Sequence, residues 1–253
     1  MKAYLANVRP KPVHSGSSPQ AQETARQMRE GIWISPMDGE NPQAVFNTQL
    51  GGASVHMGRG SWKLYKGLVL RPFPRTTGAS FFDGPLAMLG DHDTKIEPIW
   101  TPTGIAATDH LIEVYRNRTV LKDLWLSHGS RYAGASIYVH DCSDVTIENI
   151  YMDAAQVAIY LKNVARVRIT GLNVRGLNST GFLMEHCEDC SIGQCILAES
   201  ATSDEVIMDA ACNRNVIVGN DFGLTGVING ASLGVGNRPV LGDVSLNVCG
   251  AVT

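Results

Sequence analysis

The chain has 253 residues, of which 44% are hydrophobic and only 18% are charged, and it contains 26 glycines. This length and apolar content suffice for a substantial core, which excludes wholesale disorder. The low charge, against roughly 25% in an average globular protein, favours an all-β chain that hides part of its surface in an assembly. A formal net charge of −3 leaves no cationic excess, so we expect no nucleic-acid partner and no membrane insertion.

The beginning of the chain sets further expectations. It lacks the apolar segment of a secretory signal, so we expect assembly in a host cytoplasm, where the six cysteines stay reduced. Residues 1–18 carry prolines and a glycine–serine cluster without periodicity, which predicts an extended N-terminal arm. Residues 19–50 are expected to hold a capping helix over 19–30, beginning at Pro19, and a connecting loop over 37–47.

A repeat dominates the rest of the chain. The phrase apolar-x-x-apolar returns at intervals of 26, 25, 26, 22, 23, 26 and 23 residues, starting at Leu70, Ile96, Leu121, Ile147, Ile169, Ile192, Val218 and Leu241. A period in the twenties, built from short β-branched strands and glycine or asparagine turns, indicates stacked repeats that bury their faces against their neighbours. We predict about eight coils of parallel β-structure over residues 51–253.

Alignment of the units predicts which side chains point inward. Four columns are apolar throughout: Ile137, Ile159, Phe182 and Val206; Val139, Leu161, Met184 and Met208; Cys142, Val164, Cys187 and Cys212; and Val145, Val167, Cys190 and Val216, with an extra residue in the last turn. We interpret the columns on either side as polar or charged. Such alternation of apolar and polar residues is typical of strands that bury one face.

Two segments, residues 159–172 and 216–222, resemble the right-handed parallel β-helix of the pectate-lyase-like superfamily. Residues 53–64 are similar to the strand that follows the capping helix in many phage tailspikes and sugar-cleaving members. The resemblance covers about residues 50–250. It implies an all-β, single-stranded right-handed parallel β-helix with a short N-terminal capping helix and an extended arm. It implies no single function, because the superfamily includes lyases, hydrolases, epimerases and virion proteins.

The columns argue against catalysis. A polysaccharide hydrolase needs carboxylates gathered on one face, yet the corner column Asp144, Arg166, Asp189 and Arg214 alternates in sign, as do His140, Lys162, Glu185 and Asp209, and Asp153 over Arg175. Such alternation is typical of charge pairing across strands. The motif Gly230–Gly234 matches a serine nucleophile elbow, but no histidine follows it. We therefore assign no catalytic residue.

No metal or cofactor is expected either. Cys187, Cys190, Cys195 and Cys212 replace aliphatic residues of the predicted core, so packing is favoured over zinc binding. The Asp91–His92–Asp93 cluster is interpreted as a solvated turn. His56, His110 and His128 receive no role.

One outward column departs from polarity. Four residues after the first residue of each repeat phrase, from Ile96 to Val218, come Trp100, Trp125 and Tyr151, then Asn173, Ile196 and Phe222. An exposed aromatic stripe marks a partner surface, and subunit packing is the first interpretation. Two alternatives stay open: a stacking platform for the sugar rings of a host surface polysaccharide, and cover by the chain's own loops.

Together these features predict a non-enzymatic structural protein of a bacteriophage virion, such as a tail fibre, spike, adaptor or capsid decoration. We expect a homotrimer of side-by-side β-helices that docks to other virion proteins through the N-terminal arm. The alternative is a polysaccharide lyase or glycoside hydrolase that acts on a bacterial surface polysaccharide.

Overall fold

The computed structural model describes residues 31–36, 41–48, 53–74, 81–82, 85–91, 93–100, 109–128, 134–177, 179–198, 204–222, 228–230 and 238–239. The predicted arm over 1–18 and the predicted helix over 19–30 lie outside these residues.

The described residues form short strands and one helix. The first elements are β1 (Ile32–Ile34), α2 (Pro42–Thr48), β2 (Ala53–Met57), β3 (Gly60–Leu64), β4 (Leu68–Leu70), β5 (Phe73–Pro74), β6 (Phe81–Phe82), β7 (Leu86–Leu89), β8 (Thr94–Pro98) and β9 (Ile112–Val114). The middle strands are β10 (Thr119–Ser127), β11 (Ala135–His140), β12 (Thr146–Asp153), β13 (Val157–Ala165), β14 (Arg168–Thr170), β15 (Asn173–Arg175) and β16 (Thr180–Glu188). The last are β17 (Ser191–Gly193), β18 (Ile196–Ala198), β19 (Asp204–Met208), β20 (Val216–Val218), β21 (Ile228–Gly230) and β22 (Arg238–Pro239).

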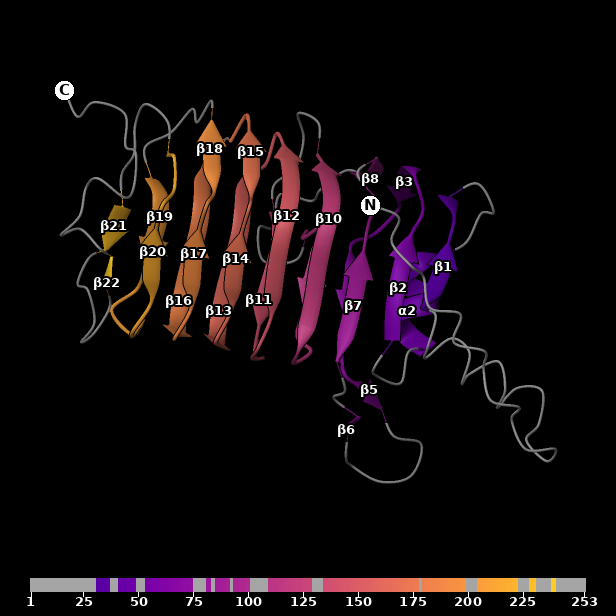
Figure 1. Ribbon diagram of the computed structural model, residues 1–253, viewed down its shortest axis with the longest axis horizontal. Helices are drawn as coiled ribbons and strands as arrows, with labels where there is room; N and C mark the ends of the chain where they lie inside the picture. The colour runs from indigo at the N-terminus through magenta and orange to yellow at the C-terminus, as the bar shows by residue number, and fades with distance from the viewer. Residues whose placement is uncertain are drawn as a thin grey trace, which may run out of the picture.

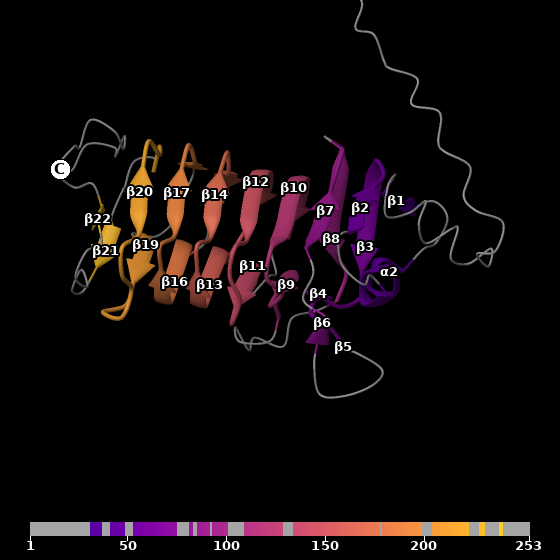
Figure 2. The ribbon, with the colours of Figure 1, turned by 60° about the horizontal axis from the view of Figure 1, so that its bottom comes forward.

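The strands stack as a parallel β-helix, which confirms the predicted fold. One sheet has 13 strands and a second has seven, and apart from the antiparallel pair β5–β6 the paired strands run parallel. Figures 1 and 2 show the strands side by side along the long axis, with α2 at one end. The described residues build about six turns. Because the predicted eight coils include residues 240–253, which are not described, that number stays a prediction.

Each complete coil has three strand faces. Face 1 contains β7, residues 119–122 and 146–148, β14, β17 and β20; face 2 contains β3, β8, residues 124–127 and 150–153, β15 and β18. Face 3 is the seven-stranded sheet, formed by β4, β9, β11, β13, β16, β19 and β21.

The corners between faces turn on single left-handed residues. Asp144, Arg166 and Arg214, at φ 61°, 56° and 52°, lie between faces 3 and 1, and Asn149 and Gly171, at φ 54° and 67°, lie between faces 1 and 2. Glycine adopts this conformation without the Cβ penalty that other residues incur. The same corner therefore recurs in each coil and keeps the strands in register.

The inward columns confirm most of the predicted register. Ile137 pairs with Ile159, which pairs with Phe182, and Phe182 pairs with Val206. The side chains of these columns are buried, and they join one core cluster that runs through the coils. At ~25 cal/mol per Å² of apolar surface removed from water, this continuous core is the main source of stability.

The last residue predicted for the fourth column is wrong by one position. Ser191 pairs with Val216, so Cys190 lies over Asn215, not over Val216. Asn215 is 1% exposed; its Oδ1 accepts from Cys190 N at 2.9 Å and its Nδ2 donates to Cys187 O at 3.0 Å. A buried amide fits here because both its donor and its acceptor are satisfied by the preceding coil.

The first two repeat phrases were also predicted out of phase. Leu70 pairs with Val114 on face 3, and Ile96 pairs with Leu126 on face 2, whereas Leu121 on face 1 pairs with Met88. The same apolar spacing occurs on different faces, so sequence spacing alone could not distinguish them.

The helix α2 corrects the predicted connecting loop over 37–47. Asn41 Oδ1 accepts from Gln43 N at 3.0 Å, which is an N-cap contact, and Pro42 occupies the first helical position. The side chain of Gln43 then bonds the main chain of Val69, accepting at 2.7 Å and donating at 3.0 Å. The helix thus covers part of the edge of β4, where an exposed edge would invite aggregation.

No helix in the described part of the chain is long and apolar enough to cross a membrane.

Candidate functional site

The predicted aromatic stripe is only partly formed. On face 2, Trp125 pairs with Tyr151, Tyr151 with Asn173, and Asn173 with Ile196, as predicted. The positions before and after belong to Lys95 and Asp221, not to Trp100 and Phe222. Phe222 is fully buried in the core, and Trp100 is partly buried against it, so neither extends the outer stripe.

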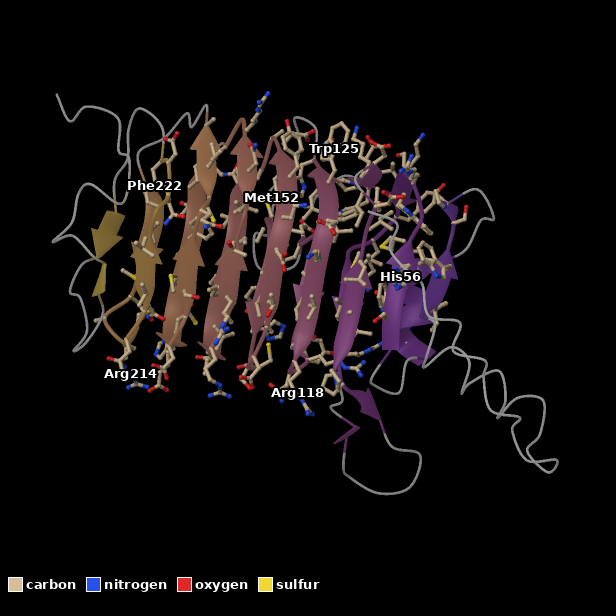
Figure 3. All side chains as sticks on the ribbon, in the orientation of Figure 1. His56, Arg118, Trp125, Met152, Arg214 and Phe222 are labelled. Atoms are coloured by element: carbon tan, nitrogen blue, oxygen red, sulfur yellow. The ribbon has the colours of Figure 1, made fainter. Side chains whose placement is uncertain are left out.

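Side chains of the neighbouring coils contact the Trp125 ring. The Nζ atom of Lys95 lies 4.7 Å from the ring centroid, and the Tyr151 ring meets it edge-on at 5.5 Å. The indole Nε1 donates to Asp153 Oδ2 at 3.0 Å. Figure 3 shows Trp125 at one edge of the solenoid, opposite Arg118 and Arg214.

A second outward column, on face 3, corrects the interpretation that the flanking columns are polar or charged. Tyr138 pairs with Tyr160, followed by Leu183 and Ile207 on the next two coils. All four side chains are half-buried. The sequence did carry this signal, since these residues stand between the two inward columns of each coil.

The tyrosines of this column stack on each other along the solenoid. The rings of Tyr138 and Tyr160 lie 4.7 Å apart at 29°, and His140 stacks on Tyr138 at 4.5 Å and 17°. Burial raises the pKa of Tyr138 to about 12, so its hydroxyl stays protonated at neutral pH. Because neighbours cover ring faces, the column presents ring edges more than open faces to an outside partner.

His140 joins two carboxylates beside the tyrosines. Its Nε2 lies 2.8 Å from Glu113 Oε1, and its Nδ1 lies 2.8 Å from Asp141 Oδ2. Burial alone would lower the pKa of His140, but the hydrogen bonds to Glu113 and Asp141 outweigh it and raise the pKa. The hydrogen bond from His140 lowers the pKa of Glu113. The three groups therefore form a charge-stabilised cluster that joins two adjacent strands of face 3, β9 and β11.

The charged column next to the tyrosines is paired within the chain. Lys162 Nζ lies 3.1 Å from Glu185 Oε2 on the following coil. Asp209 accepts from His186 N at 3.1 Å and from Ala211 N at 3.1 Å, so it closes the corner that holds the extra residue.

The predicted charge ladder between faces 3 and 1 is confirmed. Arg166 donates to both carboxylate oxygens of Asp144, at 2.6 and 2.9 Å, and Arg214 donates to both oxygens of Asp189, at 2.7 and 2.8 Å. The hydrogen bond from Arg166 lowers the pKa of Asp144 to about 2. Arg214 also contacts Glu188.

The described cysteines lie in the core, as predicted. Three thiols donate to main-chain oxygens one coil earlier: Cys142 to Val114, Cys187 to Leu161 and Cys212 to Met184, at 3.8, 3.5 and 3.5 Å. Hydrogen bonds from neighbouring thiols, together with burial, raise the pKa of Cys187, and burial raises that of Cys195 to about 11. These thiols fill space and satisfy carbonyl groups; Cys249 lies outside the described residues.

The other predicted sites stand as follows. In the turn Asp91–His92–Asp93, the carboxylate of Asp91 pairs with an arginine, since Arg59 Nε lies 2.8 Å from Asp91 Oδ2. His92 and Ser232 lie outside the described residues. In the described ranges, no cluster of three or more histidine, cysteine or acidic side chains is placed to hold a metal. His56 stacks on the exposed Trp33 at 4.3 Å, and His110 Nδ1 accepts from Ala135 N at 3.1 Å.

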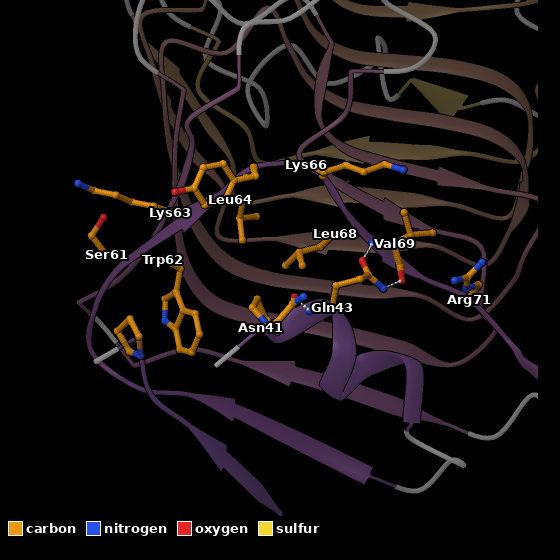
Figure 4. Close-up of a pocket in the computed structure, with 14 residues that line it drawn as sticks. Asn41, Gln43, Ser61, Trp62, Lys63, Leu64, Lys66, Leu68, Val69 and Arg71 are labelled. Carbon is orange, nitrogen blue, oxygen red and sulfur yellow. Dashed lines mark hydrogen bonds between the residues drawn. The ribbon is translucent and has the colours of Figure 1, made fainter. Parts of the chain in front are cut away.

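A cavity of about 720 Å³ lies at the α2 end of the solenoid. Figure 4 shows Trp62, Leu64 and Leu68 turned towards it and Lys63 directed away. Its inner wall is therefore apolar, and the Gln43–Val69 hydrogen bonds close one side. We assign it to the packing of the helix against the first coil.

Comparison with known proteins finds solved structures of low similarity. No family model and no curated protein matches the chain. A crystal structure described as a "putative glycosyl hydrolase" from Parabacteroides merdae has a TM-score of 0.47 and 12% identity, and the match covers 74% of this chain and 94% of that one. ORF18 of Geobacillus virus E2 has a TM-score of 0.30 and 11% identity, over 87% of this chain and 60% of that one. Similarities at this level carry no argument about function, so the proposals below rest on the chain's own geometry.

Proposed function

We propose that the chain is a non-enzymatic structural protein of a bacteriophage virion, which assembles as a homotrimer of side-by-side β-helices and docks through residues 1–18. The observation that carries this proposal is that charged side chains on the outside form ion pairs between coils. Asp144, Asp189 and Lys162 form ion pairs with the next coil, so these charges hold the coils together.

The direction of the pKa shifts supports a non-catalytic surface. A glycosidase needs a carboxylic acid with a raised pKa to protonate the leaving group. Hydrogen bonds from basic side chains instead lower the pKa of Glu113, Asp144 and Asp189. These groups are stabilised as carboxylates and are poor proton donors at neutral pH.

The outer apolar side chains support assembly. Trp125 and Tyr151 on face 2, and Tyr160 and Leu183 on face 3, point outward on consecutive coils. Ile196 follows on face 2 two coils after Tyr151. Ile196 is 44% exposed. Repeated apolar side chains at strand spacing give a second copy a regular surface to pack against.

The alternative is a polysaccharide lyase or hydrolase. The observation that favours it is the cluster of His140, Glu113 and Asp141 beside Tyr138, where titratable groups lie within hydrogen-bond distance. Lowered carboxyl pKa values and a tyrosine pKa of about 12 weigh against proton transfer at neutral pH.

A single experiment separates the two. Purified protein is incubated with bacterial capsule or lipopolysaccharide, and released oligosaccharide is measured beside the variant His140→Ala. We expect no release from either protein. Turnover by the unmutated chain that His140→Ala abolishes would overturn the structural proposal and establish the enzyme.

A further inference from the structure

Outward positions on faces 2 and 3 carry opposite charges where a face 3 strand follows a face 2 strand along the chain. On face 2, Asp153 is followed one coil later by Arg175. On face 3, Lys162 is followed one coil later by Glu185. When each face 2 strand is grouped with the face 3 strand that follows it along the chain, Asp153 is grouped with the basic Lys162 and Arg175 with the acidic Glu185.

From this arrangement we infer that face 2 of one copy packs against face 3 of the next copy in a cyclic assembly. The inference rests on the proposed homotrimer and names its two contact surfaces. Cyclic symmetry about an axis parallel to the solenoid places equal coils of all copies at the same height. Asp153 then meets Lys162 of the next copy, and Arg175 meets its Glu185.

Arg175 supplies an independent reason for a partner. It is exposed, and in the part of the chain that the structure describes no carboxylate lies within ion-pair distance of it. Glu185 pairs with Lys162 on one side and keeps a side-chain exposure of 33%. A carboxylate oxygen can accept from two cations, so Glu185 can serve its own lysine and a neighbour's arginine.

The outward side chains of the two faces, which apart from Asn173 are apolar or aromatic, also correspond in this arrangement. Tyr151, Asn173 and Ile196 on face 2 stand at the coils of Tyr160, Leu183 and Ile207 on face 3. The occupant is a second copy and not a sugar chain, because Lys95 lies over the ring of Trp125 and aromatic neighbours stack on Tyr138, where sugar rings would need open ring faces. Ring edges and aliphatic groups remain, and these pack well against another protein surface.

The test uses a charged residue on each face. Leu183→Arg alters face 3 and Ile196→Arg alters face 2, and Val216→Arg is the matched control on face 1, where Val216 is 37% exposed. Light scattering after size exclusion measures the assembly. We expect each of the two interface variants to raise the dissociation constant at least about tenfold and the control to leave it unchanged.

Mixing the two interface variants gives the sharpest readout. Each keeps one intact face, so in a head-to-tail assembly the mixture forms a one-to-one dimer while each variant alone is monomeric. A pair of identical faces would give no such rescue. Arg175→Glu, at an exposed position, repeats the test should an arginine at position 183 or 196 disturb folding, which circular dichroism detects.

The outcomes separate this inference from the proposed function. An unmutated chain that is monomeric at all concentrations defeats the homotrimer and the inference together. A trimer that survives both Leu183→Arg and Ile196→Arg defeats the two named faces and leaves the homotrimer standing. A polysaccharide that is cleaved by an intact trimer defeats the structural proposal and leaves the interface.

Discussion

Two columns that are neighbours along the strands of face 3 obey different rules. Val139, Leu161, Met184 and Met208 point inward and differ in shape, whereas His140, Lys162, Glu185 and Asp209 point outward and differ in charge. Inside, each residue must be apolar and fill the space between coils, whatever its partner is. Outside, charged residues form ion pairs with carboxylates or bases on a neighbouring coil, as Lys162 does with Glu185 and His140 does with Glu113. The core therefore sets the fold, and the outer columns add ion pairs between neighbouring coils.

The largest expected effect tests the inside column. Leu161→Ala leaves a cavity at a fully buried position and should lower the free energy of unfolding by about 2–5 kcal/mol. Lys162→Ala, one residue away on the outside, should lower it far less, because an exposed ion pair contributes little to stability. Urea denaturation followed by circular dichroism measures both. Equal losses would contradict the division between the two columns.

The next effect is a pH dependence from a buried histidine. Burial lowers the pKa of His128 to about 3, and its Nε2 lies 2.6 Å from Ser136 Oγ. Below the ordinary pKa of about 6.5 the unfolded chain takes up a proton that the folded chain refuses, so acidification favours unfolding. Stability should fall by up to about 1.4 kcal/mol per pH unit between pH 6 and 4 from this group. The variant His128→Gln should show a shallower slope in the same urea series, and an identical slope would rule out this role.

The smallest effect concerns the corner ladder. Arg166→Ala removes two hydrogen bonds to Asp144 at an exposed corner and should lower the free energy of unfolding only slightly, because exposed ion pairs contribute little. Salt screens exposed pairs, so the difference from the unmutated chain should shrink between 0.05 and 0.5 M sodium chloride, about a Debye length of 14 to 4 Å. A loss that is large and independent of salt would mean that the ladder contributes as the core does.

Sequence spacing predicted the central coils well because each coil there repeats every face. The columns through Ile159, Leu161 and Val164 all followed from alternation of apolar and other residues. Spacing failed where the apolar phrase falls on another face, as at Leu70 and Ile96, because every face of a β-helix shows the same alternation.

Apolarity also misled the prediction at single positions. Val216 was preferred over Asn215 for the core, yet the amide is inside because it bonds the preceding corner. Phe222 was placed on the outer stripe by the same one-residue shift and is buried. Conversely, Tyr138 and Tyr160 stand outside despite their size, since burying their hydroxyls in the apolar interior would cost the lost hydrogen bonds.

The corner at Asp209 shows how this architecture tolerates a change of length. Met184 and Cys187 are separated by two residues, whereas Met208 and Cys212 on the next coil are separated by three, and both pairs keep the same strand register. The added residue is absorbed where Asp209 bonds the main chain of the turn. Perimeter and pitch are thus independent in this solenoid: a coil can lengthen sideways without displacing the coils above and below it. Such a corner is where a foreign peptide could be displayed with the stack left intact.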